Sequence, residues 1–493
     1  MRPLLLSVGL VVCPSLAVSQ QPVPATLSLA DAISLARQNN PVYRQAIHDR
    51  SPAAWGVRNA WSSLWLPTVT ASGGVSYAGP GEQNFLTSSF SQNVSTLSSG
   101  YTFQLDWTLN GQTLSQPGMR KAQLNAADAD VTGAESNLVT GVTQQYLTVL
   151  QARDNAEVAR QQLQHDEEFQ KLAQARYDVG RASLIDVRQA QVARGSAAVA
   201  SLRARTAVDV EKLRLFQAIG VSAPVALASV QLTDTFAVQT PTWQLGDLLT
   251  MAEQQNPALR ALRERERAAG WGVKAATSSY APSVSLSAAW SGFTQKLSDV
   301  NPTIASIRQS AQADSTSCAY ANAAWFNTGT GQVPLNCALL TNTAAQERAF
   351  LDQNGRYPFN FTPQPFQARL TVSIPLWGNF QQPLQVSQAK AQQQDLQESV
   401  RARGLQVQTD VSQAYLTLQT DYQAIAIQDT SRSAAREQLQ LATERYRVGS
   451  GTFFELLDAQ VAALRAETDY IDAVYDYHKA LAALEAAVGR PLR

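Results

Sequence analysis

Two stretches of the chain match each other: RYDVGRASLIDVRQAQV at residues 176–192 and RYRVGSGTFFELLDAQV at residues 445–461. Gly180 in the first corresponds to Gly449 in the second, and the identities around them keep the same separation along the chain. Such a match indicates an internal duplication. In both copies a glycine ends one helical pattern and a Ser or Thr precedes the next, which is typical of one helix ending and another beginning. We therefore predict that both stretches are the turns of long helical hairpins.

The helical pattern extends far from both turns. No proline occurs between Pro117 and Pro224 or between Pro383 and Pro491. Apolar residues recur at steps of three, four and seven, which is the spacing of a coiled-coil seam. Arms of about 50 residues would be on the order of 75 Å long. This length favours a strut or a tube wall over a compact domain.

The composition argues against several classes of function. The chain has 493 residues, with 39 basic and 39 acidic side chains. A nucleic-acid-binding chain normally carries a basic surplus, so we expect no nucleic-acid partner. His48, His165 and His478 lie far apart, without the spacing of metal ligands. The GSG sequence at residues 449–451 lacks the flanking pattern of a phosphate loop. We therefore expect no metal site and no catalytic group.

The N-terminal residues have the pattern of an export signal. Arg2 precedes an apolar run at residues 4–12, and a small-x-small sequence ends at Ser19. We predict that cleavage after Ser19 removes residues 1–19 as a signal peptide. Lipid attachment at Cys13 is the alternative, although the valine before it stands where such signals usually have a small residue.

The exported chain keeps two cysteines, Cys318 and Cys337. An even number of cysteines in an oxidising compartment favours a disulfide. Two free thiols in a flexible loop are the alternative. No apolar stretch after the signal approaches 18 residues, so we expect no membrane-spanning helix.

The periodicity changes from helical to twofold in four places. Apolar and polar residues alternate near residues 68–77 and 101–109 in the first half, and near 283–292 and 366–376 in the second. This alternation predicts strands with one apolar and one polar face. A long loop at residues 294–364, which contains both cysteines, separates the last two strands.

Strands of about ten residues with a polar opposite face and aromatic residues toward their ends are typical of a transmembrane barrel. Four strands cannot close one, because the smallest barrels use about eight and an open edge in lipid leaves backbone groups unpaired. Several copies would each contribute four strands. The alternative is a sandwich with one face in a core. Asp106 and Arg369 fall on the polar faces. They would line the lumen. There they would either tune the conductance or have the simpler role of keeping the lumen hydrated.

The chain thus divides into a signal peptide and several mature segments. These are an N-terminal leader at residues 20–26, a first repeat at 27–220, a linker at 221–244, a second repeat at 245–489 and a C-terminal end at 490–493. Each repeat combines one long helical hairpin with two strands, so the predicted fold is mostly α with a β-barrel portion.

Several motifs together resemble a known family. They are the LxxA and NNP sequences within residues 29–41, IPLWGN at 374–379, the paired RYxVG turns and AVG at 487–489. This combination is similar to the TolC-like outer-membrane efflux proteins, and the resemblance covers nearly all of the mature chain. It implies a homotrimer with a 12-stranded barrel in outer-membrane lipid and a helical tunnel across the periplasm. It also implies a periplasmic adaptor and an inner-membrane transporter as partners, no enzymatic activity and no cofactor.

The resemblance also assigns roles to residues at the two turns. The residues that would dock the adaptor form the turns themselves: Val179, Gly180, Arg181, Ala182, Ser183, Val448, Gly449, Ser450, Gly451 and Thr452. The residues that would form or hold the periplasmic aperture are Glu455, Asp458, Asp186 and Tyr446. Some members have an arginine at the position of Gly451, where it ties neighbouring helices together. This chain lacks that side chain, so its closed state must be held in another way.

The acidic residues of the second turn also suggest an aperture on physical grounds. Glu455 and Asp458 are three residues apart, so they share one face of a helix. Threefold symmetry would bring six carboxylates near one axis, where they would favour cations and repel each other. The alternative is that these residues, like Asp186, are solvated carboxylates of a first helical turn. Only the second turn has this acidic pair, so we expect it to dominate gating while both turns share docking.

The function implied is a trimeric channel in the outer membrane of a Gram-negative-type envelope. It would be the exit duct of a tripartite efflux system and would passively export small toxic or hydrophobic compounds. One alternative keeps the fold and makes the cargo a polypeptide of type I secretion. Another is a non-porous helical scaffold that bridges the envelope.

Overall fold

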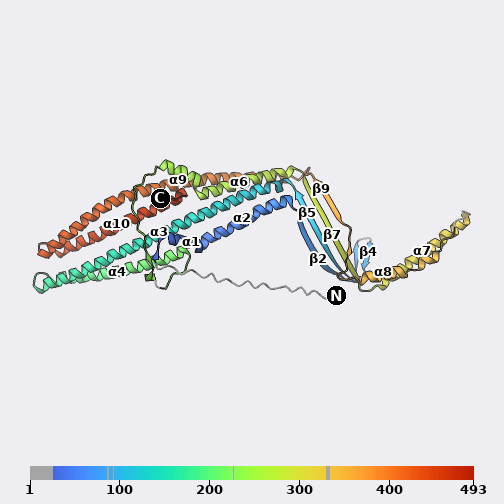
Figure 1. Cartoon of the computed structure of the whole chain (residues 1–493), viewed down its shortest axis with the longest axis horizontal. Helices are drawn as coiled ribbons and strands as arrows, with labels where there is room; N and C mark the ends of the chain where they lie inside the picture. Colours follow the sequence, from blue (N-terminus) through green and yellow to red (C-terminus); the bar gives the residue numbers. More distant parts are fainter. Residues whose placement is uncertain (1–25, 86–87, 93, 226, 329–332, 493) are drawn as a thin grey trace. The chain divides into compact units, whose positions relative to one another are not determined.

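The computed structural model describes residues 26–85, 88–92, 94–225, 227–328 and 333–492. The predicted signal peptide, Cys13 and all but the last residue of the leader lie outside these residues. Two compact units are present (Figure 1). The first comprises the described parts of Met1–Val57, Gly118–Gly270 and Lys390–Arg493, and the second comprises those of Arg58–Pro117 and Trp271–Ala389. None of the described helices combines the length and apolarity needed to cross a bilayer.

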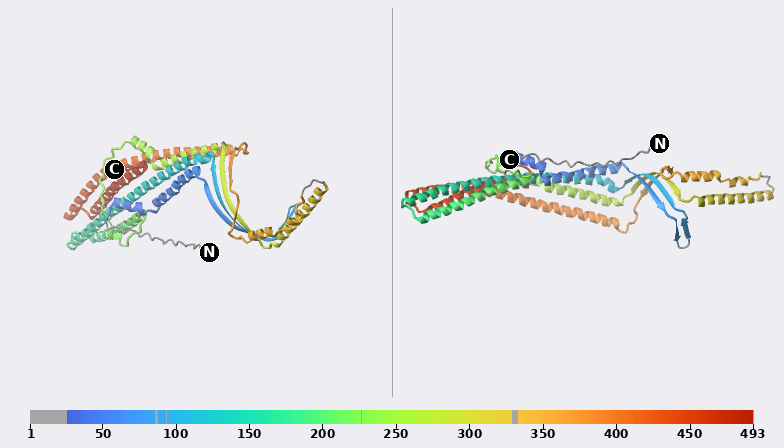
Figure 2. Two further views of the ribbon diagram at one scale, coloured as in Figure 1. Left: turned by 45° about the vertical axis from the view of Figure 1, so that its right-hand side comes forward. Right: turned by 90° about the horizontal axis from the view of Figure 1, so that it is seen from below.

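Two long antiparallel helix pairs dominate the first unit (Figure 1 and Figure 2). The first pair is α3 (Gly111–Asp178) and α4 (Leu184–Ile219), and the second is α9 (Gln381–Val448) and α10 (Phe453–Val488). The chain reverses direction at both predicted turns. Each pair joins a helix of 68 residues to one of 36, so the arms are unequal, unlike the arms of about 50 residues used to estimate their length. The short arms end early because a left-handed glycine, Gly220 or Gly489, terminates each one.

In each repeat, an asparagine that follows a short N-terminal helix contacts the end of the shorter arm of the helix pair. The shorter helices that make these contacts are α1 (Leu29–Asn39), α2 (Pro41–Trp65), α5 (Leu245–Gln255) and α6 (Pro257–Thr277). Between α1 and α2, the Asn40 amide donates to the Ala218 carbonyl at 2.8 Å. A Cβ at Gly220 would lie 2.7 Å from the Asn40 Cα, so only glycine permits this approach. Asn256 makes the matching hydrogen bond to the end of α10, at 3.1 Å.

Each half also has its own apolar core. The first core joins α1, α3 and α4, with Leu27, Tyr146, Phe216 and Ile219 fully buried. The second joins α5, α9 and α10, with Leu248, Val411, Leu418, Tyr477 and Leu484 fully buried. Burial of each such side chain contributes roughly 1.5–3 kcal/mol. A short parallel pair, β1 (Thr26–Leu27) with β6 (Gln231–Leu232), joins the end of the predicted leader to the predicted linker.

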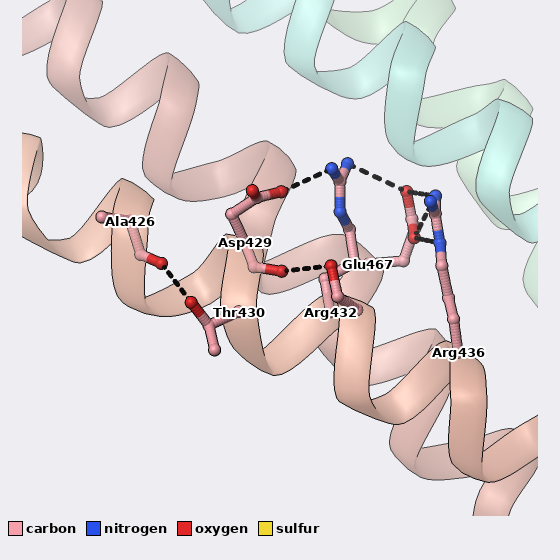
Figure 3. Close-up of polar contacts among 7 residues, drawn as sticks. Ala426, Asp429, Thr430, Arg432, Arg436 and Glu467 are labelled. Atoms are coloured by element: carbon pink, nitrogen blue, oxygen red, sulfur yellow. Dashed lines mark hydrogen bonds and ion pairs between the residues drawn. The ribbon is translucent and has the colours of Figure 1, made fainter.

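Ion pairs join the two helices of each pair, and those of the second pair are more extensive. Arg436 of α9 makes a two-pronged contact with Glu467 of α10, at 3.0 and 2.8 Å (Figure 3). Arg432 lies 3.7 Å from the same carboxylate. In the first pair, Arg194 reaches Glu167 with a single contact of 3.4 Å.

The second unit is built on an antiparallel sheet with the strand order β2-β5-β7-β9. Its main strands are β2 (Thr68–Ala78), β5 (Thr96–Leu109), β7 (Ser283–Leu297) and β9 (Gln367–Ser373). A short strand, β8 (Thr362–Pro363), pairs with part of β7, and β3 (Gly81–Phe85) forms a separate hairpin with β4 (Ser88–Gln92).

Three strands differ in length from the prediction: β5 and β7 are longer, and β9 is shorter. The central strands β5 and β7 are longer than predicted because they pair with each other as far as Thr96 and Leu297. The last strand, β9, ends at Ser373, shortly before Pro375, because proline cannot donate to a ladder.

The register of the sheet separates an apolar from a polar face. One row aligns Val69, Leu105, Ala288 and Ala368, and the next aligns Thr68, Asp106, Ser287 and Arg369. Every residue of β2 and β9 is exposed, whichever face it occupies. This exposure disagrees with a sandwich, because a sandwich buries the inward face of its strands.

The segment predicted as a long loop is largely helical, so that prediction is wrong. Residues 294–364 contain the end of β7, α7 (Asn301–Thr328), a 3₁₀ turn (Cys337–Thr341), α8 (Ala344–Asn354) and β8. Alanine is frequent in α7, and neither glycine nor proline follows its second residue, which favours a helix. Cys318 and Cys337 are joined by a disulfide. Arg308 and Glu347 bridge α7 and α8 through two hydrogen bonds of 2.7 Å, which lower the pKa of Glu347 to about 2.

Candidate functional site at the tips of the helix pairs

The two helix pairs end in tips that we define by corresponding residues. The first tip is residues 169–192 and the second is residues 438–461. At the turns, Gly180 and Gly449 have φ angles of 75° and 86°. Their amides donate to the carbonyls of Tyr177 and Tyr446, at 2.8 and 3.1 Å. A side chain in this left-handed conformation is strained, so the glycines set the reversal.

The residues after each turn cap the returning helix. The Ser183 hydroxyl accepts a hydrogen bond from the Asp186 amide at 3.3 Å, and the Asp186 carboxylate accepts one from the Ser183 amide at 2.9 Å. This reciprocal pair is a capping box. At the second tip, Thr452 accepts from the Glu455 amide at 3.2 Å. Asp186 therefore has a structural role in the first turn of α4.

The predicted docking residues lie on the surface of the tips. All ten are exposed except Ala182 and Gly451, which are half-buried. Val179 and Val448 are 69% and 75% exposed. Gly451 is restricted for a different reason from the two turn glycines: a Cβ there would lie 3.0–3.2 Å from Arg445 and Tyr446. Any side chain at this position would require the turn to shift.

A small apolar cluster holds the two tips together. Its buried members are Ala173 and Ala190 of the first tip with Tyr446, Phe453 and Leu456 of the second. Tyr446 is 3% exposed, and its ring packs edge-on against Phe453 with the centroids 5.7 Å apart. Tyr446, predicted as an aperture residue, is therefore an interior residue of this contact.

Arg176 makes the polar part of the same contact. One terminal nitrogen of its guanidinium donates to the Tyr446 carbonyl, and the other donates to the Arg181 carbonyl at 3.3 Å. The guanidinium carbon also lies 4.6 Å from the centre of the Tyr446 ring. Burial raises the pKa of the Tyr446 hydroxyl, while the Arg176 charge opposes this shift and Asp186 adds to it.

Sequence reasoning did not identify Arg176 as a functional residue. The available signal was the repetition of the RY pair, because Arg176 corresponds to Arg445. That repetition does not show which arginine crosses to the other tip.

The acidic residues of the second tip lie at the start of α10. Glu455 is near Arg445, with 3.6 Å between the Glu455 carboxylate and the guanidinium. Asp458 is exposed and has no ion pair with any residue that the structure describes. The Asp186 charge helps to raise the pKa of the Tyr446 hydroxyl, whereas Asp458 is a separate exposed charge.

An apolar groove of about 860 Å³ lies beside the tips, lined mainly by α4 and α10. Ile185 and Val192 of α4 line it, as do Phe454 and Val461 of α10. These four side chains are 59–73% exposed. Since Ile185 corresponds to Phe454 and Val192 to Val461, the two helices present the same face to the groove. Sequence reasoning did not anticipate this surface.

The remaining predicted site residues lie in the second unit. Asp106 and Arg369 share one row of the polar face, with Ser287 of β7 between them. Gln104 donates to the Asp106 carboxylate at 3.0 Å. The described residues contain no group of three or more His, Cys, Asp or Glu side chains arranged to hold a metal ion.

Comparisons with known proteins agree with this architecture. Residues 32–221 and 338–490 match the family model described as outer membrane efflux protein. The chain is 24% identical over 381 residues to the outer membrane efflux protein BepC of Brucella suis biovar 1 (strain 1330), an alignment that covers 77% of this chain and 69% of BepC. It is also 24% identical over 263 residues to the outer membrane protein TolC of Vibrio cholerae serotype O1, covering 52% of this chain and 57% of TolC.

Two solved structures share the fold. The outer-membrane channel OprN superposes with a TM-score of 0.69 at 18% identity, over 94% of this chain and 89% of OprN. The outer membrane protein VceC from Vibrio cholerae superposes with a TM-score of 0.68 at 17% identity, over 94% of this chain and 97% of VceC. The resemblance inferred from the motifs is confirmed. Because the family model matches more than half of the chain, the chain belongs to the outer membrane efflux protein family.

Proposed function

We propose that three copies of this chain form an outer-membrane channel that passively exports small toxic or hydrophobic compounds. In this proposal the channel is the exit duct of a tripartite efflux system, with a periplasmic adaptor and an inner-membrane transporter. Family membership supports the proposal, since BepC is named an efflux protein and OprN an outer-membrane channel. The channel itself has no enzymatic activity and needs no cofactor.

The observation that carries this proposal is the four-stranded sheet with two exposed edge strands. Within the described chain, β2 and β9 each pair with one strand of this sheet. Open edges in lipid leave backbone groups without hydrogen bonds, so a sheet in a membrane must close on itself. Pairing of β2 of one copy with β9 of the next closes a 12-stranded barrel, a size within the known range.

The two faces of the sheet fit opposite sides of such a barrel. The apolar face carries exposed side chains such as Val69, Phe103, Trp290 and Leu370, which are 49–69% exposed. This face meets lipid. The polar face, with Asp106 and Arg369, lines the lumen.

The helix pairs form the periplasmic tunnel in this proposal, and their tips form its inner end. Each repeat, residues 27–220 or 245–489, contributes one pair. The exposed turns dock the adaptor, and the apolar groove beside them is the kind of surface that binds an amphipathic helix. Residues 1–19 direct export.

The aperture of the tunnel is formed by the second tip. Threefold symmetry places three copies of Asp458 and Glu455 around the axis, where their carboxylates favour cations. Asp458 contributes more than Glu455, because Arg445 lies near the Glu455 carboxylate. Asp186 and Tyr446 support the aperture indirectly, through the first turn of α4 and the contact between the tips.

Planar-bilayer recordings of the purified full chain test the channel directly. We expect ion conductance from trimers, with an increase when the aperture is loosened. Trimers that never conduct would favour a non-porous scaffold. A deletion strain distinguishes the cargo: sensitivity to small hydrophobic toxins supports efflux, whereas loss of a secreted polypeptide with unchanged sensitivity supports type I secretion.

Block by trivalent cations tests the aperture residues. We expect the double substitution Asp458→Ala and Glu455→Ala to raise the blocking concentration about tenfold, the equivalent of about 1.4 kcal/mol. The matched control is Asp178→Ala, which removes a carboxylate from the first tip. Unchanged block in the double variant would remove both residues from the aperture.

A further inference from the structure

We propose that Arg445 of one copy donates a hydrogen bond to the main-chain carbonyl of Tyr177 in the neighbouring copy. The contact that Arg176 makes with Tyr446 inside each chain would then be repeated between chains. This inference rests on the proposed trimer, and it names the residues that join the tips of adjacent copies.

The contact inside one chain provides the template. Arg176 uses one terminal nitrogen to cross to the Tyr446 carbonyl of the second tip. Its other terminal nitrogen donates to the Arg181 carbonyl of its own turn, at 3.3 Å. The crossing arginine is thus positioned by its own tip before it reaches the other one.

Arg445 is positioned in the same way but does not cross. It donates to the Ser450 carbonyl of its own turn at 3.4 Å, and Ser450 corresponds to Arg181. Among the described residues, the Arg445 side chain makes its polar contacts with its own tip, including one with Glu455 at 3.6 Å. The hydrogen bond to its own turn is therefore present at the second tip. The hydrogen bond that would cross to another tip has no acceptor within the described part of the chain.

Tyr177 offers the matching acceptor on the first tip. Its carbonyl accepts the Gly180 amide at 2.8 Å, as the Tyr446 carbonyl accepts the Gly449 amide at 3.1 Å. A carbonyl oxygen has two lone pairs, and at Tyr446 the second one receives Arg176. At Tyr177 the equivalent site is open within the described chain.

The apolar surroundings of the two tyrosines differ in burial. A contact between copies requires that the surroundings of Tyr177 be exposed within one chain. Tyr446 is 3% exposed and Phe453 is 5% exposed, whereas their counterparts Tyr177 and Leu184 are 40% and 50% exposed. The first tip therefore carries an uncovered copy of the surface that the second tip buries.

The second tip also exposes the surface that would contact Tyr177 and Leu184 of another copy. Leu172 packs against the apolar cluster between the tips. Its counterpart Leu441 is 59% exposed. A second copy of this chain is the occupant that fits, because its second tip presents Leu441 and Arg445 to the Tyr177 and Leu184 surface. Such head-to-tail contacts form a closed ring when the rotation between copies closes.

Photocrosslinking of the full chain in the outer membrane tests this contact. With p-benzoylphenylalanine in place of Leu184, we expect crosslinked dimers and trimers, with mass spectrometry locating the link within residues 438–448 of another copy. The same probe in place of Phe453 is the matched control, and we expect it to link within one chain to residues 169–176. Trimers that conduct but lack the Leu184 crosslink to a second copy would overturn this inference and leave the proposed function intact.

A second variant tests the arginine itself. Because a hydrogen bond from a charged donor is stronger than one from a neutral donor, we expect Arg445→Gln to reduce the yield of the Leu184 crosslink between copies about tenfold. Arg447→Gln, which removes an exposed arginine of the same tip, should leave the yield unchanged. An undiminished yield in Arg445→Gln would show that the arginine does not make the contact. Absence of both trimers and conductance in the unmodified chain would overturn the proposed function and this inference together.

Discussion

The two tips have closely related sequences and different environments. Both contain an RY pair, yet Tyr446 is buried against the first tip, with 3% of its surface exposed, while Tyr177 is 40% exposed. Arg176 reaches the other tip, while Arg445 contacts its own. The difference lies in the neighbours. The second tip packs against the first tip of the same chain, whereas the matching side of the first tip has no such partner among the residues that the structure describes. The same residue types thus acquire different roles from the segments that lie beside them.

The largest expected effect comes from removing the buried tyrosine. Tyr446→Ala leaves a cavity in the cluster between the tips, and such truncations cost about 3–5 kcal/mol. The matched change Tyr177→Ala removes an exposed ring and should cost far less in a single chain. Hydrogen exchange of the tip amides in detergent-solubilised full-length protein measures both. Equal protection losses in monomers would mean that the two environments are alike.

Tyr446→Phe refines that comparison. The Tyr446 hydroxyl has no hydrogen-bond partner among the residues that the structure describes, so its removal should leave exchange of the tip nearly unchanged. Loss of protection confined to trimers would indicate that a neighbouring copy supplies a partner for the hydroxyl.

Loss of the helix caps should have an intermediate effect. Ser183→Ala breaks a complete capping box and should cost about 1 kcal/mol. Thr452→Ala removes a single capping hydrogen bond and should cost somewhat less. Exchange of the first-turn amides of α4 and α10 reports each loss separately. A larger effect at Thr452 would reverse the expected order.

The smallest effect should come from the ion pairs along the helix pairs. Exposed ion pairs contribute about 0.2–1 kcal/mol. Glu467→Gln disrupts the two-pronged contact with Arg436 and should lie toward the upper end of this range. Glu167→Gln disrupts one longer contact and should lie toward the lower end. Exchange rates in α10 and α4 test this order, and equal effects would contradict it.

Sequence reasoning succeeded where the deciding signal is local. The reversals at Gly180 and Gly449 follow from left-handed glycines and hydroxyl caps, which act within a few residues. The strands follow from alternation over about ten residues. The prediction failed at residues 301–328, where the cysteine and the long distance between strands suggested a loop despite an alanine-rich composition. It also missed that Asn40 and Gly220 pack together, since nothing in their separation along the chain indicates contact.

The sequence by itself determined where the chain turns, which segments are helical hairpins or two-faced strands, and the family. These properties depend on backbone conformation and on the period of apolar residues. Only the tertiary structure decided which copy of the RY pair is buried, which arginine crosses between the tips, and that Asp186 caps a helix while Asp458 remains exposed. The physical reason is that burial and hydrogen bonding across the tips depend on which segments become neighbours, and the RY pair that both tips share cannot specify this difference locally.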